Sequence, residues 1–214
     1  VYRTPYALSL AYAAREAVRT CDITSPTLHP LERQNLWVAA MTGSDRPLYL
    51  PLKAQAEFDH VRYELMELGS DKVLYYELLS DVYMENKEKI EAGEIDAGDL
   101  FAPESGLTFD ITVEHDGILY FYIPTEYPND VTVYVNGEYY GSLDGSDLDY
   151  VKSLGYRETG DELHVTVRME KCSFFYYPVD SVCFYQEDAE AVTESMRALT
   201  AGNFRITSYT EDAF

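Results

Sequence analysis

Residues 116–145 read DGILYFYIPTEYPNDVTVYVNGEYYGSLDG, and this stretch decides the fold of the 214-residue chain. Ile118–Ile123 is a dense run of β-forming residues, and Val131–Val135 is a second run that ends at Asn136-Gly137. An Asn-Gly pair between apolar runs favours a two-residue hairpin turn, because both central residues must accept a positive φ. A strand, a corner and a hairpin in so short a stretch are typical of an antiparallel sandwich or barrel.

The neighbouring residues continue the β pattern on both sides. Leu107–Glu114 and Leu163–Met169 alternate apolar and polar side chains, as strands with one buried face do. Shorter strands are predicted at Ser173–Tyr177 and Val182–Tyr185, and an amphipathic helix at about 187–200. The sequence therefore predicts a mainly β protein, an antiparallel β-sandwich of jelly-roll type with a few flanking α-helices.

The first half of the chain is more mixed. Leu28–Thr42 is predicted as a helix, because Pro30 suits its first turn and Gly43 suits the position just past its end. We expect residues 1–105 to form a mixed α/β lead-in, with an acidic exposed loop at about 93–105, that packs on a sandwich of residues 106–214. Together they are expected to make one compact unit.

One segment of this half fits two structures. The apolar residues of Glu57–Leu68 match helical spacing and also match the alternation of a strand. A turn at Gly69-Ser70-Asp71 and a strand-like run at Lys72–Leu79 follow it. A hairpin of two strands is the preferred interpretation, and the helix stays open. The polar residues of Ser80–Glu91 then return to a helical pattern.

Charge and hydropathy restrict the possible partners. The 38 Asp and Glu residues exceed the 16 Lys and Arg residues, which gives a formal net charge of −22. Such an anionic surface disfavours nucleic acid and anionic lipid headgroups, since both need a basic footprint. No run approaches the ~20 apolar residues that span a bilayer. Because the chain starts at Val1 and not at Met, we expect a piece of a longer protein.

Three cysteines do not form a metal-binding or disulfide pattern by their spacing. If the strands at Ser173–Tyr177 and Pro178–Val182 pair about a turn at Tyr177-Pro178, Cys172 and Cys183 fall opposite each other, and a cross-strand disulfide is possible. Two buried free thiols are the alternative, and the one we favour.

The sequence offers no assembled catalytic or metal site. It lacks a G-x-S-x-G turn and a phosphate-binding loop, and its four histidines lack metal-ligand spacing. No catalytic residue, metal or cofactor is expected. Aromatic residues could instead stack on sugar rings, although packing is the more common role of tyrosine on a sheet. The candidates are Trp37, Tyr127, Tyr139 and Tyr140.

Two sets of short motifs follow one another along the chain. The first set is Pro5-Tyr6-Ala7-Leu8, Pro30-Leu31-Glu32-Arg33-Gln34-Asn35 and Met41-Thr42-Gly43. The second set is Gly117-Ile118-Leu119-Tyr120, Val133-Tyr134-Val135-Asn136-Gly137, Leu154-Gly155 and Gly160-Asp161-Glu162-Leu163. Both sets resemble the extracytoplasmic domain of the YfhO-type family of bacterial polytopic membrane proteins. The sequence departs from the family pattern at Leu31, where Phe is usual, and at His29, where Asn is usual.

The resemblance implies a large membrane protein, related to glycosyltransferases, that transfers lipid-linked sugars to cell-wall polymers outside the membrane. The present residues would form an accessory domain that positions the acceptor, and the membrane-embedded remainder of the parent chain would be its partner. Wall polysaccharide or lipid-linked sugar would be further partners. Gln34, Asn35, Asn136 and Gly137 would define the fold, as a helix anchor and a turn, and no catalytic residue carries over.

Two other functions remain open from the sequence. One is a carbohydrate-binding module of jelly-roll type that uses the aromatic candidates named above. The other is a structural surface module.

Overall fold

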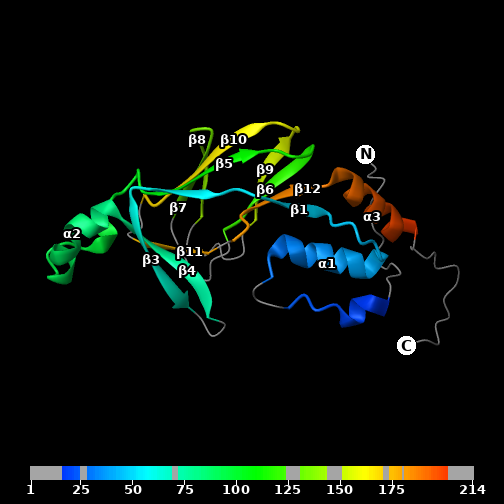
Figure 1. Cartoon of the computed structure of the whole chain (residues 1–214), viewed down its shortest axis with the longest axis horizontal. Coiled ribbons are helices and arrows are strands. Elements are labelled where there is room, and N and C mark those ends of the chain that lie inside the picture. Colours follow the sequence, from blue (N-terminus) through cyan, green and yellow to red (C-terminus); the bar gives the residue numbers. More distant parts are fainter. Residues whose placement is uncertain are drawn as a thin grey trace, which may run out of the picture. The chain divides into compact units, whose positions relative to one another are not determined.

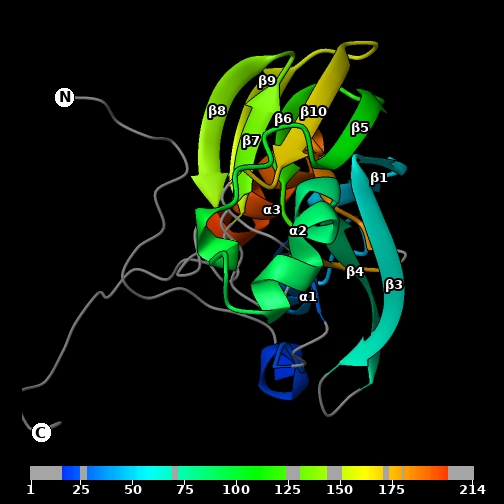
Figure 2. The same ribbon diagram turned by 90° about the vertical axis from the view of Figure 1, so that its left-hand side faces the viewer.

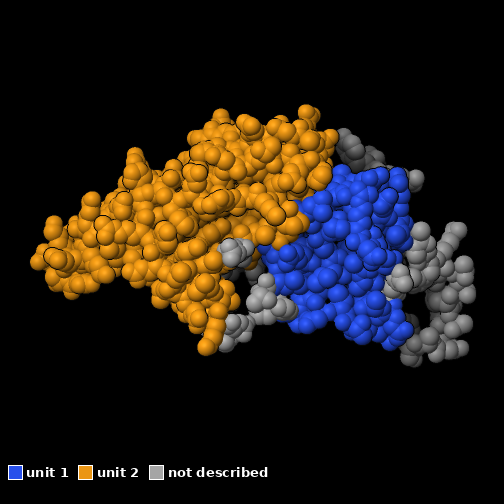
Figure 3. All heavy atoms as spheres, in the orientation of Figure 1, with its two compact units in different colours: residues 1–50, 187–214 blue, residues 51–186 orange. Residues whose placement is uncertain are grey.

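A computed structural model describes residues 16–24, 28–68, 72–123, 131–143, 151–170, 174–179 and 181–201. Contacts within the chain divide it into two compact units (Figure 3). Unit 1 comprises residues 1–50 and 187–214, and unit 2 comprises residues 51–186. The division at about residue 105 that the sequence suggested stays a prediction.

The described residues form twelve strands, three α-helices and two short 3-10 helices (Figure 1). In chain order these are η1 (Glu16–Thr20), α1 (Pro30–Thr42), β1 (Tyr49–Leu52), β2 (Ala56–Asp59), β3 (Val61–Leu68), β4 (Val73–Ser80), α2 (Asp81–Glu91), η2 (Ala97–Asp99), β5 (Gly106–Thr112), β6 (Gly117–Phe121), β7 (Val131–Val135), β8 (Glu138–Leu143), β9 (Lys152–Arg157), β10 (Glu162–Arg168), β11 (Phe174–Pro178), β12 (Phe184–Glu187) and α3 (Ala189–Ala201).

The strands form three antiparallel sheets, which confirms the mainly β fold class. Their orders are β1-β12-β6-β9, β2-β5-β10-β7-β8 and β11-β4-β3. Within unit 2 the first two sheets face each other across a buried phenylalanine cluster. The ring of Phe109 on β5 lies 6.5 Å from that of Phe121 on β6 and 5.2 Å from that of Phe184 on β12. This facing arrangement is that of a sandwich.

The hairpin predicted at Asn136-Gly137 forms between β7 and β8. Asn136 has φ 52° and Gly137 has φ 79°, so both central residues adopt the left-handed conformation that the turn requires. The side-chain oxygen of Asn136 also accepts a hydrogen bond from the backbone N–H of His164 on β10, at 2.8 Å. Asn136 therefore shapes the turn and ties it to the neighbouring strand.

The ambiguous segment before residue 69 folds as strands, and the preferred hairpin of β3 with β4 is confirmed. Figures 1 and 2 show it as a long twisted pair. The expected single strand is nevertheless broken into β2 and β3 at His60, which has φ 47°. Its carbonyl oxygen accepts hydrogen bonds from Asp81 N at 3.0 Å and Ser105 Oγ at 2.8 Å. These contacts hold a conformation that histidine rarely adopts.

A turn at Tyr177-Pro178 that pairs Ser173–Tyr177 with Pro178–Val182 does not form in the described residues, since Pro178 is part of β11. β11 pairs with β4 and β12 pairs with β6, because each finds its partner in a different sheet. Cys183 is a buried free thiol, and Cys172 lies outside the described residues. The strand pairing on which the disulfide hypothesis rested is therefore not formed.

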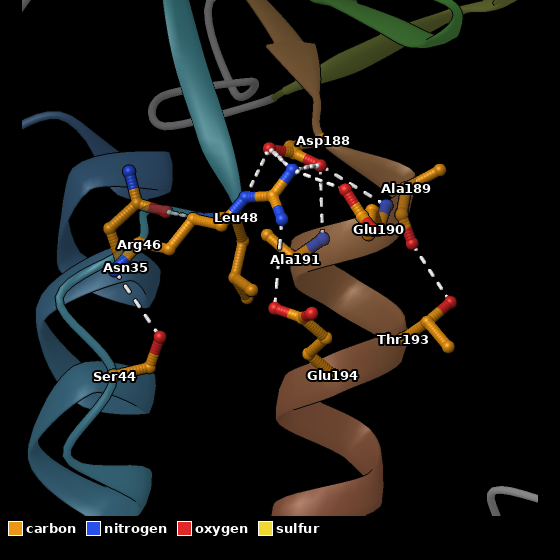
Figure 4. Close-up of polar contacts among 10 residues, drawn as sticks. All are labelled: Asn35, Ser44, Arg46, Leu48, Asp188, Ala189, Glu190, Ala191, Thr193 and Glu194. Atoms are coloured by element: carbon orange, nitrogen blue, oxygen red, sulfur yellow. Dashed lines mark hydrogen bonds and ion pairs between the residues drawn. The ribbon is translucent and has the colours of Figure 1, made fainter.

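In unit 1, α1 begins and ends as the sequence predicted. Nδ1 of His29 accepts a hydrogen bond from Leu31 N at 3.1 Å and so caps the helix, and Gly43 ends it with φ 76°. Asn35, on the second turn, binds the start of β1 with both the oxygen and the nitrogen of its amide, and Figure 4 shows the contact with Leu48. Its Oδ1 accepts from Leu48 N at 2.8 Å and Tyr49 N at 2.9 Å, and its Nδ2 donates to Tyr49 O at 2.8 Å. Gln34, by contrast, is exposed.

A second polar junction of unit 1 joins residues that are far apart in the sequence. The Arg46 guanidinium donates two hydrogen bonds to the Asp188 carboxylate, at 2.8 and 3.0 Å (Figure 4). Asp188 also caps α3, because its Oδ1 accepts from Glu190 N and Ala191 N. The N–H of Asp188 in turn donates to Leu48 O at 2.8 Å. The beginning of β1 and the start of α3 are thus fixed to each other.

Candidate functional site

A groove of about 710 Å³ lies in unit 2, beside the third sheet. Its walls come from the segment that joins β1 to β2, from β2, β4 and β11, and from the residues just before β12. The lining residues are Leu52, Lys53, Ala54, Gln55, Ala56, Phe58, Tyr76, Tyr177, Ser181 and Val182. This volume lies within the roughly 300–1,000 Å³ of typical ligand sites.

Strand register explains why aromatic rings gather at this groove. Tyr76 on β4 is paired with Tyr177 on β11 and with Leu65 on β3, so the three share one face of the sheet. The ring of Phe58 on β2 lies 5.4 Å from that of Tyr76 and 6.4 Å from that of Tyr177. Tyr63 extends the cluster outward, with ring distances of 5.1 Å to Phe58 and 5.3 Å to Tyr76.

The apolar face continues along the β3–β4 hairpin beyond the groove. Leu78 is fully buried in the core, and Tyr76 is half-buried at the groove. Further out along β4, on the same face, Leu74 is 41% exposed. Exposure therefore rises along β4 away from the core, and on β3 Tyr63 and Leu65, opposite Leu78 and Tyr76, are 53% and 58% exposed on the same face.

Polar groups at the groove are few. Among the described lining residues, Lys53, Gln55 and Ser181 carry side-chain hydrogen-bonding groups in addition to the tyrosine hydroxyls. Behind the lining, the Cys183 sulfur lies 3.7 Å from the hydroxyls of both Tyr177 and Ser181. Burial raises the pKa of the Cys183 thiol to about 11, against the smaller lowering effect of these two hydroxyls. The thiol is therefore protonated and unreactive at neutral pH.

A smaller pocket of about 320 Å³ surrounds His60, also in unit 2. The ring nitrogens lie 3.9 Å from Asp81 Oδ2 and 3.8 Å from Glu104 Oε2, and Glu85 lines the same pocket. These groups are largely exposed, with the His60 side chain at 62%. Among the described parts of the chain, no group of three or more His, Cys, Asp or Glu residues could hold a metal ion.

Of the aromatic residues singled out from the sequence, the three that the structure describes do not line the groove. Tyr139 is 66% exposed on β8 and contacts the ring of Tyr134 at 6.1 Å. Tyr140 is 41% exposed, and its hydroxyl donates to the carbonyl oxygen of Ser153. Trp37 is half-buried on α1 in unit 1, and Tyr127 lies outside the described residues. Their role in sugar binding stays a prediction.

Sequence reasoning missed the residues that do form the groove. Phe58 of the lining and its neighbour Tyr63 lie in the segment that fitted both helix and strand, and Tyr76 of the lining lies in the strand-like run at Lys72–Leu79. The available signal was the concentration of aromatic residues between positions 58 and 76. Only the break at His60 and the β4–β11 pairing place them on one surface.

Comparison with known proteins identifies a family. The model of the family described as bacterial membrane protein YfhO matches residues 1–214. No curated protein matches the chain. Within the described residues, no helix is both long and apolar enough to cross a membrane.

One similar solved structure is a cycloisomaltooligosaccharide glucanotransferase from Paenibacillus sp., in complex with cycloisomaltoheptaose. The match has 9% sequence identity and a TM-score of 0.26, and it covers 65% of the present chain. The chain spans 17% of the length of that protein.

Proposed function

We propose, from the premise that the chain belongs to the YfhO family of bacterial membrane proteins, that it forms an acceptor-positioning domain on the outer side of the cytoplasmic membrane. In this proposal the membrane-embedded remainder of the parent chain transfers lipid-linked sugars to cell-wall polymers. The present domain contributes no catalytic group and holds the polymer near the site of transfer. Its partners are the rest of the parent chain and the polymer.

The aromatic groove of unit 2 is the observation that carries this proposal. Exposed and half-buried rings beside a few polar groups favour binding of a ligand with both apolar faces and hydroxyl groups. The absence of a nucleophile or acid–base pair from the described groove lining fits a holding role better than a chemical one. The anionic composition further disfavours nucleic acid as the ligand.

Removal of the domain from the parent protein tests the role. We expect cells that carry the parent without residues 1–214 to show reduced sugar transfer onto wall polymer, measured by the sugar content of the purified polymer. The membrane level of the shortened parent must match that of the full-length protein, because a lost parent would give the same result. Unchanged transfer at equal membrane levels would overturn the positioning role.

A further inference from the structure

We propose that the groove beside β4 and β11 binds a run of uncharged sugar residues, and that Tyr63 is the ring on which one of them stacks. The site is the one through which the proposed function would hold its polymer, so this assignment of ligand class rests on that function. It adds the chemistry of the ligand and the residue that recognises it.

Ring geometry supports stacking at Tyr63. Its side chain is 53% exposed, yet it is held in place by ring contacts with Phe58 and Tyr76 at 5.1 and 5.3 Å. The planes of these two rings make angles of 45° and 80° with that of Tyr63, so neither ring stacks flat on it. A flat apolar surface that is already ordered loses little conformational entropy when a pyranose ring covers it.

The remaining groups at the groove suit hydroxyl-rich ligands. The amide of Gln55 offers both donors and an acceptor, and the hydroxyl of Ser181 offers one donor with acceptor capacity. Sugar hydroxyls need this mixture, because each of them both donates and accepts. The half-buried Tyr76 and the buried Tyr177 supply the apolar floor between these polar groups.

Charge favours an uncharged ligand over a phosphate-bearing polymer. Lys53 is the one charged residue among the described residues that line the groove. The chain as a whole carries a formal charge of −22, which repels a polyanion at low ionic strength. For a phosphate polymer, the electrostatic repulsion from the anionic protein would therefore exceed the attraction to this single lysine.

Binding by the purified 214-residue chain tests the assignment. The probes are uncharged hexasaccharides of glucose, of N-acetylglucosamine and of mannose, with poly(glycerol phosphate) as the anionic counterpart, and titration calorimetry is the measurement. We expect at least one hexasaccharide to bind with an affinity that salt does not change, and poly(glycerol phosphate) to bind more weakly. Absence of binding by every hexasaccharide, or tighter binding of the polyanion, would overturn the assignment.

A matched pair of variants locates the site. Tyr63→Ala is expected to weaken hexasaccharide binding about tenfold, because it removes the stacking surface. Tyr156→Ala removes a tyrosine of β9 that is 60% exposed and does not line the groove, and should change the affinity by less than about twofold. Equal losses in the two variants would place the ligand elsewhere. Both changes are at exposed side chains, so both variants should fold.

Hexasaccharide binding that depends on Tyr63, together with normal transfer by the parent lacking the domain, would reject the positioning role alone.

Discussion

The two compact units are stabilised by different kinds of contact. In unit 2, apolar side chains from all three sheets form one buried cluster, which includes Leu78, Phe109 and Phe184. In the described part of unit 1, polar groups join distant segments: the Asn35 amide binds the backbone of Leu48 and Tyr49, and the Asp188 carboxylate binds the Arg46 guanidinium. Unit 2 should therefore lose most stability when an apolar side chain is truncated. Unit 1 should lose most stability when a hydrogen-bonding group is removed.

The largest effect is expected from the apolar core of unit 2. Leu78→Ala should lower the free energy of unfolding by about 3 kcal/mol, because it removes a fully buried side chain and leaves a cavity. Leu74→Ala is the matched control, four residues away on the same face of the same strand, and should cost about 0.5 kcal/mol or less. Urea denaturation followed by circular dichroism measures both. Similar costs would contradict the gradient of burial along this hairpin.

In unit 1, the corresponding loss of stability is expected when the amide of Asn35 is removed. Asn35→Ala should cost about 2 kcal/mol, since Leu48 N and Tyr49 N lose their acceptor and Tyr49 O loses its donor. The neighbouring exposed Gln34 supplies the control, and Gln34→Ala should stay within about 0.5 kcal/mol of the unchanged protein. If the two variants were equally stable, polar anchoring would not distinguish unit 1 from unit 2.

The pH dependence of unit 1 should reveal its capping histidine. Burial, with a smaller contribution from the nearby charge of Arg33, lowers the pKa of His29 to about 4. The folded protein therefore prefers neutral His29, and this stabilisation is complete above about pH 6.5 and is lost as the pH falls towards 4. Protonation also converts the Nδ1 acceptor of Leu31 N into a donor.

We expect the free energy of unfolding to fall by about 1.5 kcal/mol through this effect. This is less than the full pKa shift of His29 would give, because partial contact with solvent weakens the effect. His29→Asn keeps an acceptor at the helix start and does not titrate, so it removes this part of the acid sensitivity. Urea midpoints of both proteins at pH 7 and at pH 4.5 give the difference. If the urea midpoints of the two proteins changed equally between pH 7 and pH 4.5, the assignment to His29 would be rejected.

The smallest effect is expected at the tight turn of unit 2. Gly137→Ala should cost about 1 kcal/mol, because alanine at φ 79° is strained even though nothing lies within 4 Å of its new Cβ. In Gly141→Ala, on the same hairpin, the new Cβ would meet only the flexible end of Lys152, at 3.4 Å, and the backbone is not left-handed. Thermal unfolding should therefore separate the two variants, and equal melting temperatures would show that backbone strain is absent from this turn.

Local chemistry made part of the fold predictable from the sequence. Asn136-Gly137 specifies its own turn, and Pro30 and Gly43 mark the ends of α1. His60 carries no such mark, because its left-handed conformation is imposed by Asp81 and Ser105, which lie far along the chain. The pairing of β11 with β4 is likewise a long-range choice. The groove depends on both of these features, which is why its aromatic residues could not be grouped from sequence alone.

The bond between Arg46 and Asp188 has a consequence for the order in which the chain acquires its structure. The two residues are separated by 142 positions, and all of unit 2 lies between them. At a synthesis rate of about 5–20 residues per second, Arg46 waits about 7 to 28 seconds before Asp188 is made. Synthesis of unit 2 ends only two residues before Asp188, so Arg46 lacks this partner for as long as unit 2 is being made. Unit 1, although it includes residues translated before unit 2, can close only after unit 2 has been synthesised.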